Sequence, residues 1–206
     1  MRWRAWWKQN RTWLALLIPL LALALGASAF RLTRLYLPWE YHRPQVSATN
    51  TMRFTQSFSK GNSTTFTRTV DITVTAVEAV SDYDGHIPIE GGTMYRIDLA
   101  FAAAPDQMLK GCTVALIGPD GTQYGTQAAQ NTDLRARQTF ASPDCVPNDA
   151  PGPDWDGLSD TLVPATVERP AQWSRSIAVT LPPSVPPTQV RISWDAPEYA
   201  LLQVPN

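Results

Sequence analysis

The feature that most constrains this chain is an uncharged run near its N-terminus. From Trp13 to Phe30 there are eighteen residues without a charge, and Ser28 is the only polar residue among them. In an α-helix such a run covers about 27 Å, which is close to the thickness of the hydrocarbon core of a bilayer. The run predicts a membrane-spanning helix or a signal sequence, and both place the remainder of the chain outside the cytosol.

The residues on both sides of the run favour an anchor that is retained. Four basic residues and no acidic residue precede it, which predicts that the N-terminal side stays in the cytoplasm. Aromatic side chains flank both ends, as is typical of the interface between hydrocarbon and headgroups. The basic residues are Arg2, Arg4, Lys8 and Arg11, and the aromatic residues are Trp3, Trp6, Trp7 and Trp13 on one flank and Tyr36, Trp39 and Tyr41 on the other.

The alternative is a cleaved signal peptide and a secreted product. Ala27 and Ala29 have the spacing that signal peptidase prefers, so cleavage would follow Ala29. Two features argue against it: the apolar run is longer than a typical signal core, and the segment that follows Ala29 remains rich in apolar and aromatic residues. We therefore expect a single-pass protein of the cell membrane, with the lipid of the cytoplasmic membrane as its first partner.

The two cysteines of the chain agree with export. Cys112 and Cys145 both follow the apolar run. In an oxidising compartment an even number of cysteines predicts a disulfide, here a single one that joins these two residues. The alternatives are two buried free thiols or a metal pair, and two sulfurs without a nearby histidine are a poor metal site.

We expect four parts along the chain. Residues 1–12 form a basic, tryptophan-rich cytoplasmic segment, 13–37 the spanning helix with its membrane-proximal end, 38–50 a linker, and 51–206 one extracytoplasmic domain. In the domain, apolar and polar residues alternate with the period of two that is typical of half-buried strands. Strands are expected at 51–59, 65–80, 94–101, 111–125 (a hairpin), 133–141, 172–182, 188–195 and 199–204, with an irregular stretch at 142–160.

This pattern predicts an all-β fold, an antiparallel β-sandwich that follows one N-terminal transmembrane helix. An immunoglobulin-like arrangement is our first expectation, and a barrel or a jelly roll is the alternative. The apolar phase slips by one residue between Val74 and Val77, which predicts a bulge or a switch between sheets. Trp173 and Trp194 lie in or beside alternating strands and are expected in the core.

The layout of the chain resembles that of a group of known proteins. A start "MRWRAWWKQNR", one span, "YLPWEY", the strand "YRIDLAF", the hairpin "GCTVALIGPDGTQYG" and a closing "LPPSVPPTQVRISWDAPEY" look like uncharacterised actinobacterial envelope proteins with an immunoglobulin-like exported domain. The resemblance covers nearly the whole chain. It implies no enzyme activity and assigns no catalytic residues.

Few residues are suited to catalysis. The histidines, His42 and His86, are the only bases that titrate near neutral pH, and the chain contains no GxSxG string. We therefore expect no enzyme activity, no catalytic residue and no cofactor. The formal net charge is −1 and the basic residues beyond the N-terminus are scattered, so nucleic acid is not an expected partner.

An acidic stretch is the one constellation that suggests a ligand. Asp154, Asp156 and Asp160 follow one another at short spacing in the expected irregular stretch, and carboxylates at alternate positions before a glycine are how calcium loops begin. The run lacks the full ligand set, so a solvated acidic loop is the simpler interpretation. Trp155 and Tyr83 are candidates for contact with a partner, although Trp155 can equally pack onto the domain.

Together these patterns predict a non-catalytic binding or scaffolding protein of the bacterial cell envelope, with another envelope protein as partner. The alternative is a module that binds a small ligand, carbohydrate or calcium, and an exported hydrolase is a third possibility. Sandwich folds host many functions, so the fold class alone does not choose among them.

Overall fold

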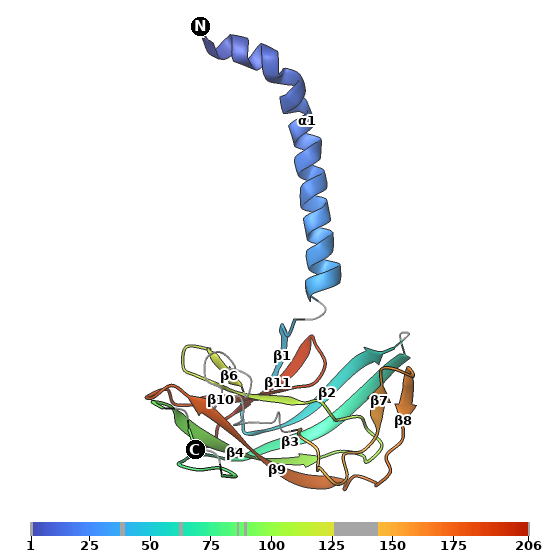
Figure 1. Ribbon diagram of the computed structural model, residues 1–206, viewed down its shortest axis with the longest axis vertical. Helices are drawn as coiled ribbons and strands as arrows, with labels where there is room; N and C mark the ends of the chain where they lie inside the picture. Colours follow the sequence, from blue (N-terminus) through green and yellow to red (C-terminus); the bar gives the residue numbers. More distant parts are fainter. Residues whose placement is uncertain are drawn as a thin grey trace.

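The computed structural model describes residues 2–37, 40–61, 64–85, 87–88, 90–125 and 144–205. It shows one long helix that stands clear of a β domain (Figure 1). The strand expected at 133–141 and the loop residue His86 lie outside the described residues.

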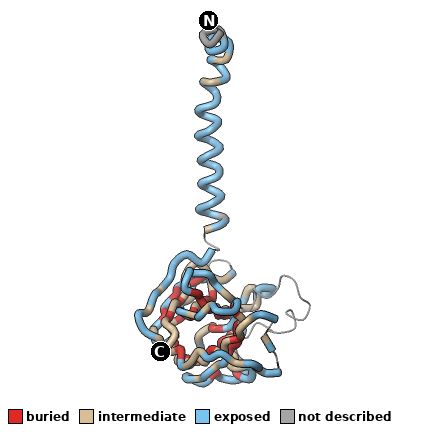
Figure 2. The backbone as a smooth tube through the Cα atoms, turned by 90° about the vertical axis from the view of Figure 1, so that its left-hand side faces the viewer, coloured by how far each residue is buried: buried red, intermediate tan, exposed pale blue. Residues whose placement is uncertain are grey.

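The helix α1 runs from Arg2 to Arg31 and continues into a π-helical turn, η1, from Leu32 to Tyr36. Its segment Trp6–Arg34, 29 residues, is apolar and long enough to cross a membrane, and its most apolar part is nowhere buried by the domain. Figure 2 shows the same helix exposed along its length. Pro19 lies inside α1 and cannot donate to the carbonyl four residues before it, which is the usual cause of a bend in a helix.

Two sheets make up most of the domain. One has the order β1-β11-β10-β5-β6 and the other β2-β3-β4-β9, while β7 and β8 form a separate hairpin. All strand pairs are antiparallel except β1 with β11, which is parallel. The strands are β1 (Arg43–Val46), β2 (Thr51–Lys60), β3 (Thr64–Val80), β4 (Thr93–Ala102), β5 (Thr113–Ile117), β6 (Gln123–Gly125), β7 (Asp154–Asp156), β8 (Thr161–Val163), β9 (Gln172–Leu181), β10 (Gln189–Ser193) and β11 (Glu198–Gln203).

The alternation read from the sequence explains which face of each strand is buried. In β4, Ile97, Leu99 and Phe101 are buried while the residues between them are partly exposed. The register of β3 with β4 shifts between Val74 and Ala76, which confirms the predicted bulge. Buried residues of both sheets belong to one hydrophobic cluster, so the two sheets share a single core (Figure 2).

The segment between the helix and the domain is shorter than the expected linker at 38–50. Residues 43–46 form β1, which lies beside β11 with Arg43 opposite Glu198 and Val46 opposite Leu201. The backbone N–H groups of His42 and Arg43 also donate to the carbonyl of Pro197, each at 3.0 Å. A strand of four residues is too short to show periodicity in the sequence, and this one is held by backbone bonds at the edge of a sheet.

The stretch expected to be irregular, 142–160, also contains regular structure. Its described part includes β7, which pairs with β8 through Trp155 opposite Leu162. A three-residue strand is too short to give a periodic signal, and the prolines around it read as loop.

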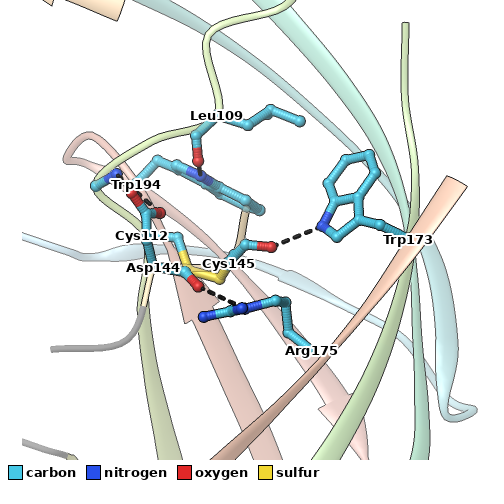
Figure 3. The surroundings of a disulfide bond; sticks show 8 residues. Leu109, Cys112, Asp144, Cys145, Trp173, Arg175 and Trp194 are labelled. Atoms are coloured by element: carbon cyan, nitrogen blue, oxygen red, sulfur yellow. Dashed lines mark hydrogen bonds between the residues drawn. A yellow bond between two sulfur atoms is a disulfide. The ribbon is translucent and has the colours of Figure 1, made fainter. Parts of the chain in front are cut away.

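A disulfide joins Cys112, just before β5, to Cys145, as the cysteine count predicts. The Cα atoms are 5.7 Å apart, and both residues are buried. Two tryptophans pack beside it and use their indole N–H groups in the same way. Trp173 donates to the carbonyl of Cys145, and Trp194 donates to the carbonyl of Leu109, each at 2.7 Å (Figure 3). The cystine and its flanking backbone are thus tied to β9 and to the end of β10.

A buried arginine holds the loop that follows β4. Arg169 is 1% exposed, and its guanidinium donates to the carbonyls of Ala104 (2.7 Å), Gln107 (2.9 Å) and Pro151 (3.3 Å). The guanidinium carbon also lies 4.8 Å from the ring centroid of Trp173. Burial lowers the pKa of Arg169, and the nearby charge of Asp106 opposes this effect.

Two glycines with nearly the same backbone conformation test the Arg169 contact. Gly152 has φ +85°, and a Cβ there would lie 2.5 Å from Nη1 of Arg169, whereas Gly121 has φ +82° with open space around it. Gly121→Ala should lower the free energy of unfolding by about 1 to 2 kcal/mol, because alanine is strained in the left-handed conformation. Gly152→Ala should cost a further ~1 to 3 kcal/mol, because it also overpacks the guanidinium. Denaturant unfolding of the full chain in micelles, followed by tryptophan fluorescence, measures both, and equal losses would contradict the account.

The disulfide gives a second prediction. Its cysteines are 33 residues apart, and closing a loop of that size restricts the unfolded chain by about 3 to 4 kcal/mol in the chain-entropy model. The variant carrying Cys112→Ser and Cys145→Ser should lose stability of that order in the same unfolding experiment. Alkylation of the wild-type chain should add mass only after reduction, and alkylation without reductant would show that the bond is absent.

Candidate functional site

The β7–β8 hairpin lies beside the end of β2–β3, at the right of the domain in Figure 1. The ring of Trp155 stands edge-on to Phe66 with centroids 5.7 Å apart, and Phe66 stacks on Phe58 at 5.8 Å. Gly61, at the turn after β2, has φ +55°, and a Cβ there would lie 1.9 Å from Oδ1 of Asp160 and 2.7 Å from the Trp155 ring. The hairpin is therefore packed tightly against the end of β2–β3.

The indole of Trp155 is half-buried and packs against Phe66, and it also lines a groove beside the hairpin. The fully exposed residue of the hairpin is its neighbour Leu158, which is 100% accessible. Sequence patterns do not separate the two interpretations of Trp155, because a tryptophan among prolines and acids can either anchor a partner or pack onto its own fold.

The carboxylates predicted as calcium candidates have other partners. Asp154 forms an ion pair with Lys110, whose Nζ donates a hydrogen bond to the carboxylate at 2.7 Å. This hydrogen bond is the main cause of the raised pKa of Lys110. Asp156 accepts from Ser159 Oγ at 2.6 Å and from the backbone N–H of Leu158 at 2.9 Å, and these bonds lower its pKa. In the described part of the chain no three Asp, Glu, His or Cys side chains are placed to hold a metal ion.

Tyr83 lies far from this hairpin. Its hydroxyl donates to the carbonyl of Ser176 in β9 at 2.6 Å, and burial is the main cause of its raised pKa. Ser176 is opposite Asp98, which is itself opposite Ala76 in β3, whereas Trp155 contacts Phe66 at the start of the same strand. The two aromatic candidates therefore belong to different ends of the sheet and do not form one site.

Two grooves flank the β7–β8 hairpin. The first, of about 490 Å³, is apolar, with Leu162, Ala165 and three prolines in its lining and Asp106 and Glu168 as its ionisable residues. The second, of about 420 Å³, holds Asp149, Asp154, Asp156 and Lys110 beside Trp155 and Val163. Pro164 and Ala165 line both grooves, so the hairpin and the turn after it separate them.

Beneath the hairpin end of β2–β3 lies a buried charge network. Arg68 is 2% exposed, its Nη2 donates to a carboxylate oxygen of Asp195, and its guanidinium carbon lies 3.7 Å from the ring centroid of Phe58. Lys60 donates to the other oxygen of Asp195 at 2.7 Å. Burial lowers the pKa of Arg68, and the charge of Asp195 opposes this. Nε and Nη1 of Arg68 have no partner among the described residues.

The sequence carries part of the signal for this network. Arg68 falls on the same parity of β3 as Phe66 and Val70, and Gln56 falls between Phe54 and Phe58 in β2. A polar residue in the inward phase of a strand predicts a buried polar contact. The partner, Asp195, gives no such signal, because it follows β10 and is brought near only by the fold.

The ring of His42 is not hydrogen-bonded to a serine, threonine or cysteine among the described residues. Its Nδ1 forms a hydrogen bond with the carbonyl of Glu40, at 2.9 Å. What this region offers chemically is a pair of acid-lined apolar grooves on either side of an exposed hairpin.

No protein-family model, no curated protein and no solved structure matches the chain.

The charge network predicts an asymmetry between its two cations. Asp195→Asn should destabilise the domain by about 2 to 4 kcal/mol, because Arg68 then stays buried without its counter-charge. Lys60→Gln should cost under ~1 kcal/mol, because Lys60 is partly exposed and water replaces its partner. Denaturant titration measures both variants. Equal losses would show that Arg68 does not depend on the carboxylate.

Proposed function

We propose that this chain is a membrane-anchored, extracytoplasmic protein of the cell envelope whose β domain binds or scaffolds another envelope protein without catalysis. The observation that carries the proposal is an apolar helix, exposed along its length, that is followed after a few residues by a disulfide-bonded domain. The helix requires a lipid environment, and a buried disulfide is typical of a compartment outside the cytosol. The N-terminal side of α1 lies in the cytoplasm in this proposal.

The proposal includes an immunoglobulin-like arrangement of the domain. Support comes from the strand order β3-β4-β9 in one sheet facing β11-β10-β5-β6 in the other, with the chain crossing between sheets after β4, before β9 and after β9. Such crossing is typical of immunoglobulin-like sandwiches. In this interpretation β1 and β2 extend the arrangement at its N-terminal side.

A second candidate function is a small-ligand module that uses the groove around Trp155. The favouring observation is that this groove pairs the indole with Asp149, Asp154 and Asp156 in one concave surface. Against carbohydrate, the indole is half-buried and contacts Phe66, which leaves less of it for stacking on a sugar. Calcium or carbohydrate titration followed by the fluorescence of Trp155 tests this candidate, with Trp155→Phe as the control.

The proposed location is tested by fractionating cells and measuring the mass of the mature chain. The proposal predicts a membrane-bound chain that still contains α1 and whose domain is digested by protease added outside the cytoplasmic membrane. Ala29→Leu should leave the processing unchanged, because no cleavage follows that residue. A soluble product that begins at Phe30 would reject the anchor, and a protease-protected domain in the cytosol would reject the whole proposal.

A further inference from the structure

Strand β8 is an edge that is open to an added strand. The β7–β8 sheet has two strands only, and in Figure 1 β8 lies on the outer side of the domain. All three of its residues are exposed, with Leu162 at 47% and Val163 at 45%. An exposed edge presents unpaired backbone groups, which is the surface that peptide segments use when they bind by strand addition.

The two faces of this edge lead into the two grooves. Successive residues of a strand point to opposite faces, and accordingly Leu162 lines the first groove while Val163 lines the second. A segment laid beside β8 would therefore project alternate side chains into both grooves. The apolar linings of the grooves supply contact area for the stems of those side chains.

Both grooves carry negative charge. Asp106 and Glu168 are the ionisable residues of the first groove, and neither forms an ion pair among the described residues. The second groove has three carboxylates against one base, Lys110, which is already paired with Asp154. Arg169 lies underneath but is 1% exposed, so a ligand in the grooves meets mainly carboxylates.

We propose that the edge of β8 binds an extended, basic segment of another envelope protein, which adds as a third strand to the β7–β8 hairpin and places lysine or arginine side chains in the two grooves. This inference rests on the proposed function, because it names the surface and the chemistry of the partner. Lysine and arginine fit because their apolar stems cover the groove walls while their charges meet the rim acids.

The same charges disfavour the other occupants of an exposed edge. A second copy of β8 would bring only Thr161, Leu162 and Val163 to the edge, and it would offer no basic side chain to the carboxylates of the grooves. Anionic lipid headgroups would be repelled by the same carboxylates. A cationic peptide is the partner for which apolar contact, backbone pairing and charge all agree.

The probe is a fluorescein-labelled peptide of about ten residues in which pairs of lysines alternate with pairs of valines, long enough to pair with the whole edge. It is titrated against the full chain in phosphatidylcholine nanodiscs and followed by anisotropy. Both faces of the added strand then carry lysine in either register, so both grooves are probed. We expect saturable binding that weakens with salt, and slower hydrogen exchange at Thr161–Val163 in the bound state. Failure to bind, or binding without protection of β8, would overturn the inference.

Variants of the rim acids separate this site from general charge attraction. Glu168→Lys should weaken binding roughly tenfold, and it should favour a matched peptide with glutamate in place of lysine. Asp82→Lys makes the same charge change on an exposed residue outside the grooves and should alter affinity less than about twofold. Equal weakening by both variants would overturn the site.

Two further results keep the outcome unambiguous. If Glu168→Lys perturbs the fold, Glu168→Gln replaces it as the test. This variant removes the charge without adding another, so an intermediate loss of affinity is expected. No loss would again overturn the site. A chain that is membrane-anchored with its domain outside but does not bind the peptide contradicts this inference alone. A chain whose domain is cytosolic contradicts the proposed function, whatever the peptide does.

Discussion

Strands β2 and β3 extend past the part of the opposite sheet that can cover them. The shared core reaches the register pair Phe54 and Val70, and the next pairs on the same face are Gln56 with Arg68 and then Phe58 with Phe66. An inner face of aromatic rings and a guanidinium cannot remain open to water without losing the contacts that order it. The end of β10 and the β7–β8 hairpin supply that cover.

The cover is polar on one side and aromatic on the other, and this determines what stays exposed. Asp195 neutralises Arg68 from the side of β10, while Trp155 packs on Phe66 from the side of β7. Because the inner side of the hairpin is occupied in this way, β8 and its acidic surroundings face outward. The binding surface proposed here is thus a by-product of closing the sandwich over strands of unequal length.

The sequence predicts the elements whose signal is long and periodic, and little of what depends on short contacts. The eighteen-residue apolar run, the alternation in β4 and the phase slip at Val74 each correspond to a feature of the structure. Strands β1, β7 and β8 escaped prediction because three or four residues carry no measurable period. Of the candidate site, the sequence places Trp155 and its neighbouring acids together because they are adjacent in the chain, whereas their partners, Lys110 and Phe66, are distant in sequence.

The brevity of the connection between helix and domain has a consequence for reach. Only residues 37–42 separate η1 from β1, and a fully extended chain of six residues spans at most about 22 Å. With α1 held in the bilayer, so short a connection keeps the domain close to the membrane surface. The domain can diffuse laterally with the lipid, but it reaches only a thin layer next to the bilayer. A binding partner must therefore lie in that layer or move into it.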